Sequence, residues 1–116
     1  MVTTCLLGAG CQQQYSIEES KSIAQDFIQQ SATLQFDGID HSLELVNTGE
    51  LECSGCWEFT CRFESRHSGY GDRAGQMLAQ VITPHEAKIT VERNEVTEGI
   101  LDGTWNMLTE SEVSAY

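Results

Sequence analysis

Two cysteines with two residues between them, Cys53 and Cys56, are the first side chains in this sequence that could do chemistry. Such a pair can act as a redox couple, supply two ligands of a metal site or close a small disulfide. A thioredoxin-type couple needs a helix start after the first cysteine, and here a strand is predicted to follow. Zinc would need further ligands, from His41, His67 or His85. We favour a structural disulfide or reduced thiols, with metal binding or redox chemistry as the alternative.

A second group mixes acid, base and aromatic side chains in one predicted loop: Arg66, His67, Tyr70, Asp72 and Arg73. Glycines flank the tyrosine, so the backbone can turn tightly while the ring projects outward. An arginine here could hold a carboxylate or phosphate in fork geometry. We predict these five residues as candidate binding residues, and a cryptic enzyme centred on His67, Asp72 and Arg73 is a further alternative. The simpler interpretation is that Arg73 pairs internally with Asp72 or another acid and fixes the loop.

His85 and Glu86 form a third group, because a histidine beside a glutamate could be a general base or a metal ligand. Adjacent residues of a strand point to opposite faces, so we do not expect the pair to act together. The sequence has no serine in a nucleophile elbow, no phosphate-binding loop and no dinucleotide fingerprint. We therefore predict a protein without catalytic residues and without a cofactor.

The charge balance restricts the possible partners. The chain has 18 acidic and 6 basic residues and a net charge of −12. Phosphate groups would be repelled, which argues against nucleic acid and against anionic membrane surfaces. A length of 116 residues fits one domain with one modest core.

These groups need elements to position them, and the clearest is a strand over 57–64. Trp57, Phe59, Cys61 and Phe63 alternate with polar residues, which is typical of a half-buried antiparallel strand. Cys61 shares the apolar face, so we predict a buried thiol that serves as a small hydrophobic side chain.

An amphipathic helix is predicted over about 16–31. Ser16 and Glu19 have the spacing of a capping box, in which the serine accepts from the amide of the third helical residue. Residues at helical spacing then give one apolar stripe, which we expect to pack against a sheet. The stripe consists of Ser20, Ile23, Ala24, Phe27, Ile28 and Ser31.

The remaining elements are predicted from alternation, glycine and proline. We expect Trp105, Met107 and Leu108 to close one end of the core, and Pro84 to end a largely buried strand. The predicted segments are an extended piece over 32–36, turns over 37–40, 47–49 and 93–95, and strands over 42–47, 77–83, 87–92 and 96–101.

One helix followed by a run of strands predicts an α+β fold, with an N-terminal helix packed against a curved antiparallel sheet of four to five strands. The order of elements over 16–103 resembles PepSY-type and cystatin-like domains, which are small exported modules. The runs CWEF, SRHSGYGDR and QVITPHEAKITVE resemble a family of short prokaryotic secreted proteins. Cystatins inhibit through a Gln-x-Val-x-Gly hairpin, and the nearest run here is Gln80–Pro84, with proline in place of the glycine.

The N-terminal run Leu6-Leu7-Gly8-Ala9-Gly10-Cys11 resembles the end of a prokaryotic lipoprotein signal. The resemblance implies lipidation at Cys11, with the membrane reached only through that anchor. We thus predict a signal remnant over 1–11, a tether over 12–15, one domain over 16–108 and a frayed end over 109–116. The favoured function is an exported, lipid-anchored or secreted binding module that acts on a protein or peptide at the cell envelope, as PepSY-like domains are thought to modulate proteases.

Overall fold

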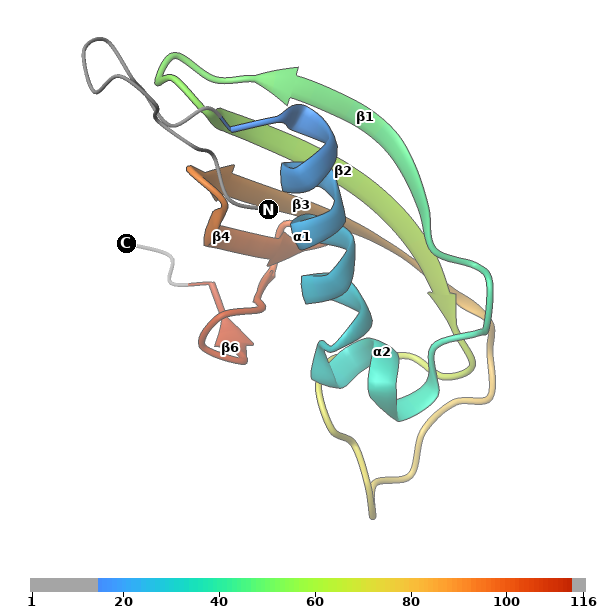
Figure 1. The fold of residues 1–116 in the computed structure, drawn as a ribbon. Coiled ribbons are helices and arrows are strands. Elements are labelled where there is room, and N and C mark those ends of the chain that lie inside the picture. The colour runs from blue at the N-terminus through green and yellow to red at the C-terminus, as the bar shows by residue number, and fades with distance from the viewer. Residues whose placement is uncertain (1–14, 114–116) are drawn as a thin grey trace, which may run out of the picture.

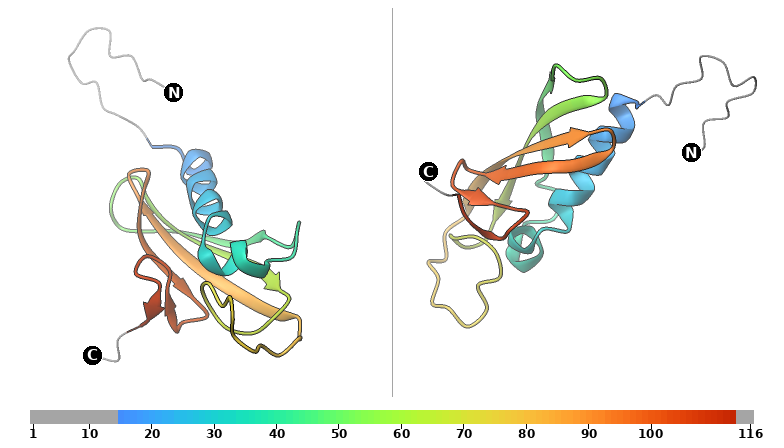
Figure 2. Two further views of the ribbon diagram at one scale, coloured as in Figure 1. Left: turned by 90° about the horizontal axis from the view of Figure 1, so that it is seen from below. Right: turned by 90° about the vertical axis from the view of Figure 1, so that its left-hand side faces the viewer.

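The computed structural model describes residues 15–113, which form two helices and one six-stranded sheet (Figure 1). Each strand pairs antiparallel with its neighbour in sequence, so the sheet runs in order from β1 to β6. Helix α1 packs on one face of the curved sheet, against β2, β3 and β4 (Figures 1 and 2). The elements are α1 Ile17–Gln29, α2 Ala32–Asp37, β1 Glu44–Glu50, β2 Cys56–Ser65, β3 Thr83–Glu92, β4 Glu95–Leu101, β5 Trp105–Asn106 and β6 Ser111–Glu112.

The predicted amphipathic helix is confirmed as α1. The Ser16 side chain accepts from the Glu19 amide at 3.0 Å and so caps the helix start. The Glu19 carboxylate does not return to the cap but accepts from the Asn94 side chain at 2.9 Å, which ties the helix to the β3–β4 turn. The predicted stripe faces the sheet, with Ala24 and Ile28 fully buried.

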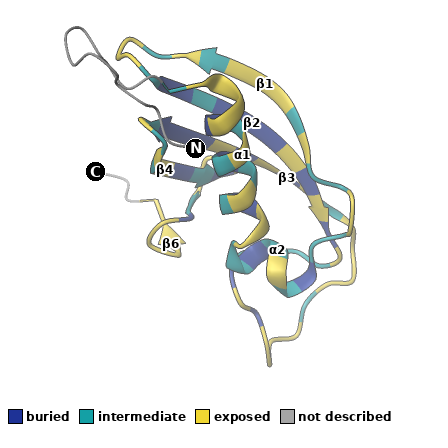
Figure 3. Cartoon of the chain, in the orientation of Figure 1, coloured by how far each residue is buried: buried dark blue, intermediate teal, exposed yellow. Residues whose placement is uncertain are grey.

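The core lies between α1 and the inner face of β2 and β3. Four cross-strand pairs of buried side chains face inward across these strands. Towards the end of β2 and the start of β3, buried residues alternate with exposed ones (Figure 3). The pairs are Trp57 with Val91, Phe59 with Ile89, Cys61 with Ala87 and Phe63 with His85. The alternation predicted for the central strand is therefore confirmed, and Cys61 is a buried free thiol.

Two predictions for residues before β2 are wrong. Residues 32–36 are not extended but belong to α2, in which Thr33 and Asp37 are buried and hold partners from another part of the chain. The predicted turn over 47–49 lies inside β1, because Thr48 and Gly49 pair with Phe59 and Glu58 of the long strand β2. Pairing with a neighbouring strand outweighs the local turn preference of these residues.

The prediction of a buried strand over 77–83 is also wrong. Residues 77–82 lie outside every strand, and Met77 is fully exposed, at 103%. Pro84 does not break a strand; it lies in β3 and pairs with Glu64 near the end of β2. A proline is tolerated near the start of a strand, where few backbone amides are needed for pairing.

The C-terminal segment is more ordered than predicted. Met107 is buried and Trp105 packs against the core, as expected, whereas Leu108 is 47% exposed. The chain then turns to form β6, so Ser111–Glu112 are not frayed, and the sheet has six strands where four to five were expected. No helix in the described residues 15–113 is long and apolar enough to span a membrane.

Candidate functional site

One buried arginine, Arg73, holds the predicted loop in place. Arg73 is 2% exposed, and its guanidinium donates to the Asp37 carboxylate at 2.8 Å. It also donates to four backbone carbonyls, those of Thr33, His67, Ser68 and Gly71, at 2.8–3.3 Å. The ring of Phe36 lies 4.7 Å from the guanidinium carbon, in a cation–π contact.

Asp37 is the counterpart of this arginine and joins it to the start of the loop. One carboxylate oxygen accepts from Arg73, and the other accepts from the backbone amide of His67 at 2.8 Å and faces its Nδ1 at 2.9 Å. The side chain of Asp37 is 4% exposed. We call Asp37, His67 and Arg73 the anchor cluster. Every buried side-chain donor and acceptor of the cluster has an internal partner, so the cluster fixes the loop to the body of the protein.

The internal pairing of Arg73 was the simpler of the two sequence interpretations, and the structure agrees with it, but the partner is Asp37 and not Asp72. Asp72 is exposed, and its carboxylate accepts from the Ala74 amide at 2.9 Å. Arg66 is also exposed, and its backbone amide donates to the Asp37 carbonyl at 3.0 Å. His67, Asp72 and Arg73 therefore do not form a common catalytic centre.

Tyr70 packs inward and not outward as predicted. Its ring stacks on Trp105 with centroids 5.5 Å apart, and its hydroxyl donates to Asp102 at 3.1 Å. Burial is the main cause that raises the pKa of Tyr70 above its ordinary value. Tyr70 thus joins the loop to the β4–β5 turn.

A Ser–His–Asp arrangement, not predicted from the sequence, lies beneath Tyr70. The Ser65 Oγ lies 3.1 Å from His85 Nε2, and His85 Nδ1 lies 2.7 Å from the Asp102 carboxylate. These are the residue types and distances of a hydrolase triad. The serine, however, is fully buried, and its hydroxyl donates to the His67 carbonyl at 2.9 Å.

Burial decides what the arrangement can do. A nucleophilic serine must reach its substrate, and the Ser65 side chain is fully buried, with its hydroxyl between the His67 carbonyl and the His85 ring. The triad is consequently a structural link between the end of β2, the start of β3 and the β4–β5 turn. Glu86, as expected, lies on the opposite, exposed side of β3.

Cys53 and Cys56 form a disulfide, which was one of the predicted outcomes. None of the three histidines approaches it closely enough to complete a cluster of metal ligands among residues 15–113, but a carboxylate oxygen of Glu92 does. The third described cysteine, Cys61, is a free thiol of low reactivity, because it is buried and burial raises the pKa of its thiol to about 11. Cys5 and Cys11, including the predicted lipidation site, lie outside the described residues.

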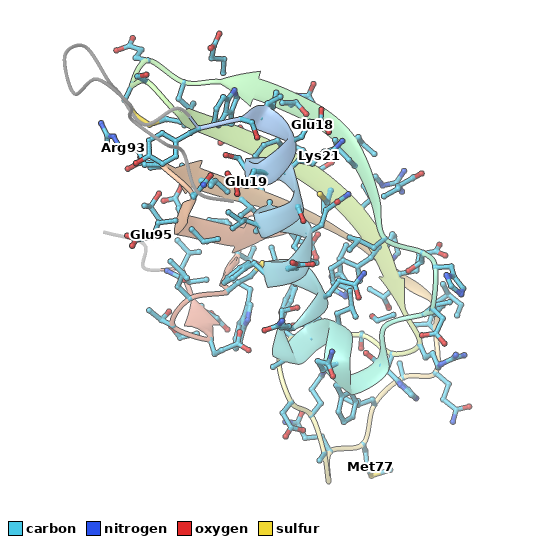
Figure 4. The ribbon with its side chains drawn as sticks, in the orientation of Figure 1. Glu18, Glu19, Lys21, Met77, Arg93 and Glu95 are labelled. Carbon is cyan, nitrogen blue, oxygen red and sulfur yellow. A yellow bond between two sulfur atoms is a disulfide. The ribbon has the colours of Figure 1, made fainter. Side chains whose placement is uncertain are left out.

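The connection between β2 and β3 contains an exposed apolar segment. We call residues 76–82 the apolar loop. Met77 is fully exposed, and Val81 and Ile82 are each 52% exposed. Met77 lies at the far end of the loop, where it points away from the body of the protein (Figure 4). No Asp, Glu, Lys or Arg lies between Arg73 and Glu86, although the chain as a whole has 18 acidic and 6 basic residues.

The sequence signal for the apolar loop is an apolar run, which favours a buried strand. The run Met77 to Ile82 is apolar, and apolar runs are more often buried than exposed. Sequence reasoning missed Asp37 as a site residue because it precedes a glycine in the predicted turn over 37–40. It missed Asp102 because that residue directly follows the strand predicted over 96–101. Comparisons with protein-family models, curated proteins and solved structures gave no match for this chain.

Proposed function

We propose that this protein is a non-enzymatic binding module whose apolar loop inserts into a pocket of a partner protein. The single observation that carries the proposal is the full exposure of Met77, together with half-exposed Val81 and Ile82, on one projecting segment. Grouped and exposed apolar side chains on an otherwise polar surface commonly mark interaction sites.

The base of the loop supports this proposal. One end of the loop follows Arg73, which is fixed by five hydrogen bonds, and the other end runs into β3 at Thr83. The anchor cluster and His85 therefore hold both ends in the body of the protein. A loop with fixed ends loses less conformational entropy on binding, which favours affinity. In this proposal Asp37 and Arg73 bind no ligand; their ion pair fixes the position from which the apolar loop extends.

The charge of the chain narrows the chemistry of the partner. The net charge is −12, whereas the apolar loop itself is uncharged. A partner with an apolar pocket surrounded by basic side chains would complement both features. An anionic membrane or a nucleic acid offers the opposite charge pattern and is disfavoured on the same grounds.

We place the module at the cell envelope, as the N-terminal run and the PepSY-like order of elements led us to expect. The Cys53–Cys56 disulfide supports this location, since disulfides persist mainly in oxidising compartments. Lipidation at Cys11 and a protease-modulating role remain part of this proposal. The run Gln80–Pro84 overlaps the end of the apolar loop, but it matches the cystatin signature only at Gln80, and a rigid proline cannot replace the glycine of that hairpin, so we do not propose cystatin-type inhibition.

Site-specific photo-crosslinking tests this function. A photoreactive amino acid replaces Met77 in the full-length protein, which is expressed in the cells that naturally produce it, and adducts are identified by mass spectrometry. The matched control carries the same group at Leu108, another exposed apolar residue outside the apolar loop. We expect one dominant protein adduct from position 77 and none in common with position 108. Equal adducts from both positions, or none from position 77, would contradict the proposal.

A further inference from the structure

Three potential metal ligands meet at the end of the sheet that is remote from the apolar loop. The Sγ atoms of Cys53 and Cys56 and a carboxylate oxygen of Glu92 all lie within 4.8 Å of one another. The ten residues of β2 separate this end from the anchor cluster, which corresponds to roughly 30 Å of extended chain. Figure 1 shows the β1–β2 connection and the β2–β3 connection at opposite ends of the sheet.

The backbone holds these ligands together independently of the disulfide. Cys56 and Glu92 are direct cross-strand partners in β2 and β3. The Arg93 amide donates to the Gly55 carbonyl at 2.8 Å, and the Leu51 amide donates to the Cys56 carbonyl at 2.9 Å. Gly55 has a φ of +77°, which lets the chain turn back between the two cysteines. These contacts do not involve sulfur, so breaking the S–S bond removes none of them directly.

We propose that reduction of the Cys53–Cys56 disulfide creates a binding site for a zinc-class divalent cation, with Cys53, Cys56 and Glu92 as its three protein ligands. A phosphine reductant gives its electron pair to the disulfide and takes up oxygen from water, which leaves two thiols. The cation then replaces the two thiol protons, which pass to solvent, while the Glu92 carboxylate binds in its ionised form. Water occupies the fourth tetrahedral position.

The donor set selects the class of cation. Two thiolates favour zinc and similar borderline metals over calcium and magnesium, which prefer oxygen ligands alone. The oxidised protein offers only the carboxylate at this place, so metal binding depends on the redox state. This inference does not rest on the proposed function, because it concerns the opposite end of the molecule.

Cobalt(II) is the probe, because thiolate-bound cobalt has a charge-transfer absorption that oxygen-bound cobalt lacks. The experiment uses the full-length protein with Cys5→Ser and Cys11→Ser, so that the thiols outside the described residues do not bind metal. We expect one cobalt ion per reduced chain, none per oxidised chain, displacement by zinc and release of about two protons per zinc ion. Cys56→Ser removes the absorption, and Cys53→Ser, at the more accessible position, does the same if the first variant folds poorly.

Glu92→Gln separates a three-ligand site from a simple dithiol. We expect the affinity of the reduced protein for cobalt to fall at least roughly tenfold in this variant, which is the loss typical when a supporting group is removed from a metal site. The control is Glu95→Gln, which changes the same charge at a nearby exposed position. Equal binding by oxidised and reduced protein, retained absorption in both serine variants, or equal losses for Glu92→Gln and Glu95→Gln would each overturn the proposal.

Discussion

Replacement of Arg73 by methionine is the most informative test of the anchor cluster. Methionine keeps a stem of similar length but removes the charge and all five hydrogen bonds of the guanidinium. Asp37 then remains buried, 4% exposed, and His67 is its one remaining side-chain partner among residues 15–113. Breaking a buried ion pair in this way costs about 3–5 kcal/mol. The stability of a domain of this size is about 5–15 kcal/mol, so the loss is a large part of the total.

The assay is urea unfolding followed by circular dichroism, with Arg66→Met as the matched control. Arg66 is exposed, and its bond to Asp37 uses the backbone amide, so its replacement is expected to cost less than about 1 kcal/mol. If Arg73 were instead a free ligand-binding residue, the two variants would unfold at the same urea concentration. That result would refute our assignment of a structural role.

A double variant, Asp37→Leu with Arg73→Met, tests whether the two side chains act as a pair. Removing both charges leaves no unpaired ion, so the double variant is expected to lose about 1–3 kcal/mol less than the sum of the single variants. Strict additivity of the three measurements would show that Asp37 and Arg73 stabilise the fold independently.

Three further predictions concern the core and the triad. Burial raises the pKa of the Cys61 thiol to about 11 in the folded protein, so the folded state holds this proton more tightly than the unfolded state does. The free energy of unfolding is therefore expected to fall as pH rises from about 9 through about 11. Urea unfolding at several pH values measures this decline, and Cys61→Ala should remove the part that Cys61 causes. A Cβ atom at Gly99 would lie 2.9 Å from the Phe27 ring, so Gly99→Ala should lower the free energy of unfolding by about 1–3 kcal/mol. The control is Gly49→Ala, whose Cβ atom would lie 3.9 Å from the Glu58 carbonyl oxygen, and thermal unfolding of this variant should change little. Because Ser65 is fully buried and donates to a carbonyl, the folded protein should not react with a fluorophosphonate serine probe; covalent labelling at that residue by mass spectrometry would contradict the structural role.

The parts of the fold that could be predicted from sequence are those whose signal is local. The alternation in β2 and the stripe on α1 each repeat over several residues and depend on a single buried face. The positive φ angles of Arg93 and Asn94 likewise form the tight turn expected between the last long strands. In these segments the local preference and the tertiary environment agree.

The parts that failed depend on residues distant in sequence. Whether residues 32–37 are helical is decided in part by Arg73, which lies 36 residues after Asp37. Whether an apolar run such as 77–82 is a strand depends on a neighbour to pair with, and β2 ends before it could reach that far. The Ser65–His85–Asp102 link joins three strand ends, and no spacing along the chain reveals it.

The most direct test of the apolar loop is the affinity of the crosslinked partner, once purified, for Met77→Asp measured by isothermal titration calorimetry. Full burial of a methionine side chain is worth about 1.5–3 kcal/mol, so our account predicts at least a tenfold increase in the dissociation constant. Leu108→Asp should bind as the unaltered protein does, and all three proteins should unfold at similar temperatures because both positions are exposed. Unchanged affinity of the folded Met77→Asp protein would contradict the account.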